Sequence, residues 1–430
     1  MIAFYNIFLV LYRISARLIS PWNRKARLWL QGRMGVFEKI RLSGISNQSS
    51  VIWMHCASLG EFEQGRPVLE NIKQKFPSCK ILLTFFSPSG YETKKNYQGA
   101  DYIFYLPFDS KKNAKQFLDI VQPKLVLWVK YEYWFYYLEE LKKKNIPVLL
   151  ISGIFREGQI FFRWYGSLHR YMLQCLAFLF VQTEESKKLL GTIGLSSNVS
   201  ISGDTRFDRV IEIAGKFEPN EVVEKFCGSS KVIVAGSTWE EDEEQLGHYA
   251  NAHTEIKFII APHEIDEERL KEAESLFRNC VRFSELEKTM SDGRSSIVHR
   301  PSPIAKTANV LLIDNIGMLA SLYRYAAITY VGGGFGDDGV HNVLEAAVYG
   351  KPVVHGPVIE KYVEATELVD CGGGIVIDSA LEAEETFNRL LSNSEEYLSA
   401  CKASAGYVRS GKGATEKIMR YIQENRLLTN

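Results

Sequence analysis

Residues 326–357 read AAITYVGGGFGDDGVHNVLEAAVYGKPVVHGP. An apolar strand at 327–331 leads into a glycine-rich turn, a short helix at 341–349 and a second strand at 352–355. This order predicts a parallel βαβ unit, whose turn lies at the carboxyl end of the sheet, where ligands bind. The stretch therefore predicts an α/β fold with a ligand site in this turn.

The turn and the helix after it carry candidate binding residues. Gly333 and Gly334 let the backbone approach a bound molecule closely. Asn342 and Glu345 lie three residues apart on one face of the expected helix, where an amide and a carboxylate could hold a ribose or sugar hydroxyl. Alternatively, Asn342 caps the helix and Glu345 is a solvated carboxylate that complements the helix dipole.

The same turn also has the glycine spacing of a dinucleotide site, at positions 334, 336 and 339. Asp337 and Asp338 inside the turn would repel a pyrophosphate, and the unit comes late in the chain rather than opening it. A dinucleotide-dependent oxidoreductase is therefore an alternative that the local sequence disfavours.

Composition indicates an ordinary globular protein. Of 430 residues, 46% are hydrophobic and 24% charged, and 51 basic residues balance 51 acidic ones. This length suggests two domains or more, and zero net charge gives no global attraction to nucleic acid, so no nucleic-acid partner is expected. Seven scattered cysteines without a CxxC pair favour reduced thiols in a cytosolic protein.

Residues 1–41 differ in composition from the rest. Residues 1–12 are almost wholly apolar but too short to span a bilayer, and eight Lys or Arg residues at 13–41 face a single acid, Glu38. Interfacial aromatics add to the pattern: Phe4, Phe8, Tyr12, Trp22 and Trp29. The segment predicts an amphipathic helix on an anionic membrane surface; the alternative is a helix packed on its own domain.

From residue 50 onward, apolar runs alternate with helical stretches, which predicts two doubly wound parallel sheets. Expected strands are 51–56, 80–85, 101–106, 124–129, 146–151, 178–182 and 199–202, then 232–235, 257–261, 309–313, 327–331 and 352–355. We expect a membrane-associating segment at 1–41 and two Rossmann-like domains, at 42–212 and 213–430. One of the helices after residue 381 is a candidate to cross back to the first domain.

Polar residues follow several of these strands. Glu61 begins a helix after the first strand, where its carboxylate can take a proton from a hydroxyl or simply complement the helix dipole. Glu132 lies among aromatics after the fourth strand. In the second half, Ser237 or Thr238 is expected to cap a helix whose acidic first turn is solvated.

Two further turns of the second half are candidates for contacting a nucleotide. His263 follows the strand at 257–261, and residues 314–318 lead into a helix whose N–H groups could grip a nucleotide. The chain has no DxD, no HExxH and no His/Cys set with ligand spacing, so neither a metal nor a cofactor is expected.

Together these turns resemble the 3-deoxy-D-manno-octulosonic acid (Kdo) transferases. Residues 55–61, 236–238, 261–263 and 331–357 carry the resemblance, which extends from the basic N-terminal segment to about Gly374. The family implies a GT-B fold, two Rossmann-like domains facing a cleft, of which 42–212 would be the acceptor domain and 213–430 the CMP-sugar donor domain. It also implies inverting, metal-independent transfer of Kdo from CMP-Kdo to the lipid A precursor (lipid IVA) in lipopolysaccharide biosynthesis, at the cytoplasmic face of the inner membrane.

The resemblance also implies roles for single residues. Glu61 matches the general base, and Glu132 the second acid of the family's Glu-x-Glu-Leu-Trp turn. The donor-binding residues are then Ser237, Thr238, Pro262, His263, Ile316, Gly317, Met318, Gly333, Gly334, Asn342 and Glu345. Two positions depart from the family: His263-Glu264 replaces Arg-His, which removes a cation, and Lys130 replaces the first acid.

Two other functions fit the same sequence. One is a GT-B glycosyltransferase that uses a UDP-sugar, and the other is a membrane-associated nucleotide-binding protein without catalytic activity.

Overall fold

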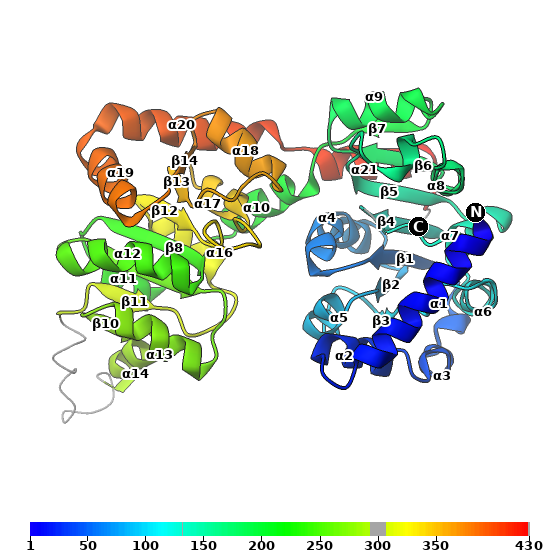
Figure 1. The fold of residues 1–430 in the computed structure, drawn as a ribbon, viewed down its shortest axis with the longest axis horizontal. Coiled ribbons are helices and arrows are strands. Elements are labelled where there is room, and N and C mark those ends of the chain that lie inside the picture. Colours follow the sequence, from blue (N-terminus) through cyan, green and yellow to red (C-terminus); the bar gives the residue numbers. More distant parts are fainter. Residues whose placement is uncertain (131, 293–306, 429–430) are drawn as a thin grey trace. The chain divides into compact units, whose positions relative to one another are not determined.

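The computed structural model describes residues 1–130, 132–292 and 307–428. The chain forms two compact units (Figure 1), Met1–Asp208 together with Lys412–Asn430, and Arg209–Gly411. The division falls inside one helix, α10 (Thr205–Gly215).

The first unit contains a parallel sheet of seven strands in the order β3-β2-β1-β4-β5-β6-β7. The strands are β1 (Val51–Cys56), β2 (Lys80–Phe85), β3 (Tyr102–Tyr105), β4 (Leu125–Val129), β5 (Val148–Gly153), β6 (Phe178–Val181) and β7 (Val199–Ile201). The expected strands of this half are all confirmed, because each is an apolar run bounded by turn residues.

Helices cover both faces of this sheet. They are α1 (Ile2–Ile19), α2 (Arg24–Gly32), α3 (Val36–Leu42), α4 (Leu59–Lys75), α5 (Pro88–Lys94), α6 (Lys111–Val121), α7 (Phe135–Lys143), α8 (Ser167–Leu173) and α9 (Glu184–Thr192), with 3-10 turns at η1 (Ile45–Asn47) and η2 (Ile160–Phe162). Successive strand residues point to opposite faces, so Trp53 joins one hydrophobic cluster and Met54 the other. The last helix, α21 (Ala414–Glu424), packs Ile418 and Ile422 into the second of these clusters, although it follows the whole second unit in sequence.

The N-terminal helix is longer than the apolar run that predicts it. Helix α1 has 18 residues, a mean hydropathy of 1.5 and only 6% of its length buried. Arg13 and Arg17 do not end it, because Ile14 and Leu18 continue its apolar face. By length and composition the whole helix could cross a membrane, whereas residues 1–12 alone are too short to do so.

The second unit repeats the arrangement, with the parallel order β10-β11-β9-β8-β12-β13-β14. The strands are β8 (Val232–Thr238), β9 (Lys257–Pro262), β10 (Cys280–Arg282), β11 (Val310–Leu312), β12 (Ile328–Val331), β13 (Val353–His355) and β14 (Gly374–Val376). The two edge strands, β10 and β14, were not expected from the sequence.

The helices of this unit are α11 (Glu221–Cys227), α12 (Glu240–Ala252), α13 (Glu267–Leu276), α14 (Phe283–Asp292), α16 (Leu319–Leu322), α17 (Val343–Ala347), α18 (Val363–Asp370), α19 (Ala380–Ser392) and α20 (Ser394–Ser410), with a 3-10 turn at η3 (Tyr323–Tyr325). The helix expected at 341–349 begins only at Val343, because Asn342 caps it, and it ends at Ala347.

Candidate functional site

Each sheet has one point at which the strand order reverses. In the first unit it lies between β1 and β4, and in the second between β8 and β12. Doubly wound sheets bind ligands outside the carboxyl ends of the strands at such a point. Glu61 and Glu132 follow β1 and β4, whereas Trp239 and Gly333 follow β8 and β12. Each unit therefore has candidate residues at its own switch point.

Glu61 lies in the first turn of α4. Ser58 caps this helix and accepts a hydrogen bond from the Glu61 N–H, at 3.5 Å. The Glu61 carboxylate turns back and accepts a hydrogen bond from the backbone N–H of Ala57. Glu61 is 7% exposed, so one backbone donor and the positive end of the helix dipole hold its carboxylate in a defined orientation.

Glu132 is held by a chain of buried polar groups. Its Oε2 accepts a hydrogen bond from Trp134 Nε1 at 3.0 Å and lies 3.4 Å from His55 Nε2. The other ring nitrogen of His55 lies 2.9 Å from the hydroxyl of Thr84. Because His55 is buried at the end of β1, this chain orients Glu132, whose side chain remains 23% exposed.

Three carboxylates of the first unit lie near the end of β1. Burial raises the pKa of the Cys56 thiol, and the nearby charges of Glu61, Glu63 and Glu132 raise it further. All three carboxylates therefore act electrostatically on the last residue of this strand. The first unit thus offers a partly exposed carboxylate and a nearly buried one at a single switch point, an arrangement suited to proton transfer.

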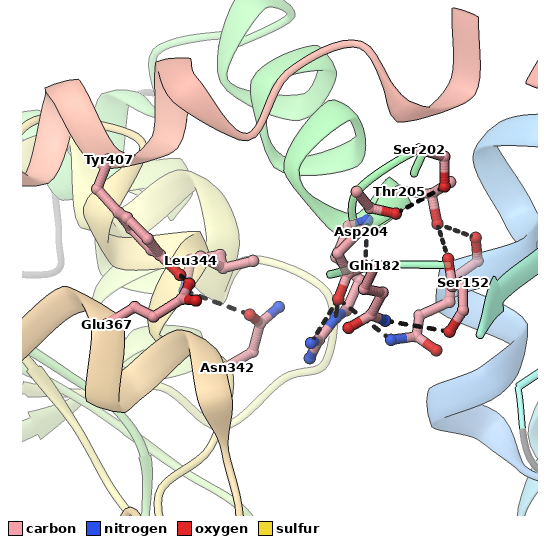
Figure 2. Close-up of polar contacts among 12 residues, drawn as sticks. Ser152, Gln182, Ser202, Asp204, Thr205, Asn342, Leu344, Glu367 and Tyr407 are labelled. Atoms are coloured by element: carbon pink, nitrogen blue, oxygen red, sulfur yellow. Dashed lines mark hydrogen bonds and ion pairs between the residues drawn. The ribbon is translucent and has the colours of Figure 1, made fainter. Parts of the chain in front are cut away.

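A separate polar cluster surrounds Asp204, after β7. Its carboxylate accepts hydrogen bonds from Arg206 at 2.7 and 2.9 Å and from Gln64 at 3.3 Å. Figure 2 shows Asp204 and Thr205 beside Ser152, whose hydroxyl lies 3.1 Å from that of Thr205. Burial raises the pKa of Asp204, but Arg206 and Lys130 outweigh it and hold the pKa below its usual value. The charge of Arg206 is thus paired with Asp204.

In the second unit, Asp242 ties the glycine-rich turn to α12. Its carboxylate accepts hydrogen bonds from the N–H groups of Gly333 and Trp239, at 2.8 and 2.9 Å, and from the hydroxyl of Tyr330 at 2.7 Å. Burial raises the pKa of Asp242, although these donors counteract it. One buried carboxylate therefore sets the conformation of the turn after β12.

Two expectations for this helix are wrong. Trp239, and neither Ser237 nor Thr238, occupies the cap position, and the acids of the first turn are not all solvated. Asp242 and Glu243 are fully buried because both point inward and find donors there. Glu243 accepts a hydrogen bond from Thr238 at 2.7 Å and pairs with Arg269, so the Thr238 hydroxyl is engaged within the fold.

Three aromatic rings meet beside this turn. Trp239 Nε1 donates to Nε2 of His341 at 3.0 Å, and the two rings are nearly coplanar, at 17°. The exposed ring of His263 stacks over both, with centroids 4.7 Å from Trp239 and 4.4 Å from His341. Burial, together with His263, lowers the pKa of His341 to about 4, so His341 is neutral and carries its proton on Nδ1. The rings form a rigid aromatic platform.

The glycines of the turn are required by the packing. Gly333 has φ +88°, and a Cβ on Gly334 would lie 2.7 Å from the backbone nitrogen of Gly356. The turn also ends before its helix begins: Gly339 precedes α17, which starts at Val343. A dinucleotide fingerprint opens its helix within the glycine motif, so this turn lacks that geometry.

Asn342 caps its helix and also pairs with Glu345, so these two residues have features of both interpretations given from the sequence. Asn342 Oδ1 accepts a hydrogen bond from the Leu344 N–H at 3.3 Å, as Figure 2 shows, and therefore caps α17. Its Nδ2 donates to Glu345 Oε1 at 2.9 Å. Both side chains are half-buried. The cap thus holds an amide and a carboxylate together.

The remaining predicted residues lie at the carboxyl ends of β8 and β9 and on the turn after β11. Ser237 is half-buried in the left-handed region, with φ +55°, and Pro262 is the buried last residue of β9. Ile316 is 87% exposed, and Gly317 follows it with φ +101°. Met318 caps α16, which has only four residues and so presents few free N–H groups.

Sequence reasoning missed several groups that the structure brings to these sites. They are His55, Trp239, Asp242 and His341. Trp239 directly follows a strand at its carboxyl end, a position that could have marked it. No local pattern identifies His341 as its partner, since 102 positions separate the two residues.

Comparisons with known proteins agree with this architecture. A family model described as 3-deoxy-D-manno-octulosonic-acid transferase (kdotransferase) matches residues 29–209. A Kdo transferase of Aquifex aeolicus is 25% identical over 82% of this chain and 89% of its own length. One of Haemophilus influenzae is 24% identical over 86% of each chain.

A longer relative and several solved structures are also similar. A bifunctional glycosyltransferase/methyltransferase of Fusobacterium nucleatum is 28% identical over 99% of this chain, which spans 62% of that relative's length. A putative UDP-N-acetylglucosamine 2-epimerase of Listeria monocytogenes has a TM-score of 0.58 at 13% identity, covering 89% of this chain and 97% of its own. MurG of Acinetobacter baumannii has a TM-score of 0.52 at 11% identity, covering 87% and 99%. These likenesses confirm a GT-B type of fold.

Proposed function

Because this chain belongs to the Kdo transferase family of glycosyltransferases, we propose that it transfers Kdo from CMP-Kdo to a lipid A precursor. The acceptor, lipid IVA, and the inversion of the anomeric centre are part of this proposal, as the family resemblance implies. A CMP-sugar already carries a good leaving group, so the protein must position the donor, stabilise the departing phosphate and deprotonate the acceptor.

We assign the proton transfer to the first unit. Glu61 accepts the proton of the acceptor hydroxyl as its oxygen attacks the anomeric carbon of Kdo, and CMP leaves from the opposite face. Its orientation by the Ala57 N–H supports this role, because a general base must be held in line with the proton it removes. Glu132, which is more exposed, orients the acceptor hydroxyl; the His55 and Trp134 contacts that fix it support this assignment.

We assign donor binding to the second unit. The exposed face of His263, backed by Trp239 and His341, suits a nucleobase, because stacking on aromatic rings accepts any planar base. The Asn342–Glu345 pair suits ribose or sugar hydroxyls, since it offers a donor and an acceptor together. The turn at Ile316, Gly317 and Met318 would close over the base. Ser237, Thr238, Pro262, Gly333 and Gly334 then form the backbone beneath these groups.

The N-terminal helix supports a membrane location, which we propose to be the cytoplasmic face of the inner membrane. Helix α1 exposes Phe4, Ile7, Phe8 and Leu11, each more than half accessible to solvent. Basic residues adjoin this apolar surface at Arg13 and Arg17, and cations near an anionic leaflet contribute about 1 kcal/mol each. A lipid acceptor that stays in the bilayer would be reached from such a surface.

The observation that carries the proposal is the presence of Glu61 and Glu132 together at one switch point. Its test is Kdo transfer from CMP-Kdo, generated in situ, to a tetra-acylated lipid A precursor. Glu61→Gln should lower kcat by roughly 10²- to 10⁴-fold. Glu63→Gln, a control on the same helix that removes a carboxylate paired with Lys94, should stay close to wild type.

Two outcomes would contradict the proposal. Equal rates for wild type and Glu61→Gln would remove Glu61 from its role. Absence of transfer by the wild-type protein, with UDP and not CMP protecting it from thermal unfolding, would favour a glycosyltransferase that uses a UDP-sugar.

A further inference from the structure

An apolar cavity of about 770 Å³ lies beside α1 in the first unit. Phe4 and Phe8 of α1 form one wall, and Tyr133, Trp134, Ile160 and Leu168 contribute to the others. We call this cavity the α1 groove. Its volume falls within the range of ligand sites, roughly 300–1,000 Å³.

The walls of the α1 groove are held in place by polar contacts behind them. The hydroxyl of Tyr5 donates to Asp109 at 2.6 Å and accepts from the N–H of Phe135 at 3.2 Å. The hydroxyl of Tyr136 donates to Asn6 at 2.8 Å. These bonds dock the first turns of α1 against α7, as Figure 1 shows for the start of the chain. The groove is therefore a preformed feature of this unit.

The lining of the α1 groove includes one carboxylate. Among the described residues that line it, Glu132 is the acidic one, and burial lowers the pKa of His169. Glu132 is also the carboxylate that His55 and Trp134 orient at the switch point. A molecule that fills the groove would thus extend an apolar body along its walls and present a polar end to Glu132.

We propose that the α1 groove binds an acyl chain of the acceptor lipid and so brings the lipid's hydroxyl to Glu132. The identity of the acceptor rests on the proposed function. The groove shares Phe4 and Phe8 with the exposed apolar face of α1, and Tyr165, which also lines it, adjoins Trp164, 90% exposed. A chain could therefore pass from a bilayer into the groove without crossing a polar surface. An acyl chain matches these walls because its burial needs no hydrogen-bond partner.

The consequence for catalysis is that acylation should raise kcat/KM and not only membrane binding. Each buried methylene contributes to binding, so a partly enclosed chain can change kcat/KM by on the order of 10- to 100-fold. Substitutions in the groove should therefore affect an acylated acceptor more than one whose ester-linked chains have been removed.

The test uses the full-length protein in lipid nanodiscs and a palmitic acid that carries a photoactivatable diazirine. Phe8→Glu places a charge in the groove at an exposed position, and Ile160→Trp fills it without adding a charge. Leu11→Glu is the matched control, because Leu11 is as exposed as Phe8 on the same helix but does not line the groove. Cross-linked peptides are identified by mass spectrometry, and kcat/KM is measured for the tetra-acylated and the de-O-acylated acceptors.

We expect cross-links within residues 159–169 in wild type and in Leu11→Glu. The yield of these cross-links should fall at least tenfold in the two groove variants. The preference for the acylated acceptor should fall about tenfold in the groove variants only. Equal behaviour of Phe8→Glu and Leu11→Glu would overturn the proposal, as would cross-links confined to α1 or to a second copy of the chain. If the groove is labelled as expected but wild type transfers no Kdo, the proposed function fails while the acyl site stands.

Discussion

Asp109 provides a quantitative test of how the N-terminal helix is attached. This carboxyl is 2% exposed and accepts hydrogen bonds from the Tyr5 hydroxyl at 2.6 Å and from the N–H groups of Tyr136 and Tyr137 at 3.1 and 3.3 Å. Burial raises its pKa from 3.8 to about 6, and the three donors only partly offset this effect. The folded protein therefore binds a proton at Asp109 in a pH range where the unfolded chain has released it.

The sign of the pH dependence follows from this difference. A raised carboxyl pKa contributes stability that is fully present below the unfolded value and is lost as the pH rises through the folded value. Roughly two pKa units correspond to about 3 kcal/mol, of which about 2 kcal/mol falls between pH 4.5 and 7.5. Asp109→Asn has no titrating group at this position. The free energy of unfolding of the variant, minus that of wild type, should therefore rise by about 2 kcal/mol from pH 4.5 to pH 7.5.

Urea unfolding of wild type and Asp109→Asn at pH 4.5 and 7.5 measures this change. The other carboxyl groups titrate alike in both proteins, so the difference between the two isolates Asp109. Asp119→Asn, which removes an exposed carboxylate paired with Lys144, is the control and should change by less than about 0.5 kcal/mol. A constant difference between wild type and Asp109→Asn, or one of opposite sign, would refute the reasoning.

Three further predictions concern single positions. Arg33→Leu removes donors from three backbone carbonyls and should lower the free energy of unfolding by roughly 3 kcal/mol in a urea titration. Arg27→Leu, at an exposed position of α2, the helix that Arg33 caps, should cost less than about 0.5 kcal/mol in the same titration. Gly334→Ala would bring a Cβ within 2.7 Å of the facing backbone and should lower the melting temperature measured by calorimetry, whereas Gly336→Ala meets its nearest atom at 3.7 Å and should not. Trp239→Ala removes part of the aromatic platform and should raise the KM for CMP-Kdo roughly tenfold with little change in kcat; an unchanged KM would contradict the platform's role.

Local sequence patterns were sufficient for twelve of the fourteen strands that the structure describes and for part of the candidate site. The strand at Val51–Cys56 is a continuous apolar run, and Glu61 follows it at the start of a helix. In a parallel sheet every strand end of this kind lies at the same edge, so the position of Glu61 at that edge follows from order along the chain. Asn342 also follows from local chemistry, since it precedes a helix and caps it.

Contacts between distant residues were decided by packing alone. An acid at the start of a helix is usually solvated, yet Asp242 is buried because Tyr330 and Gly333, far along the chain, supply its donors. The same holds for Ile418 of the last helix, which completes the core of the first unit. Ile418 is buried because the chain returns to the first unit after the second one, and the residues next to Ile418 in sequence do not indicate this return.

What the sequence determined by itself is the type and order of most elements and the edge at which the expected strands end, because these depend on side-chain periodicity and turn chemistry over a few neighbouring residues. What only the tertiary structure decided is which polar groups share a partner and which apolar side chains enclose a space. The aromatic platform at Trp239 and the α1 groove beside Glu132 both arise in this way, because hydrogen bonding and close packing act between residues that the fold, and not the order of the chain, brings together.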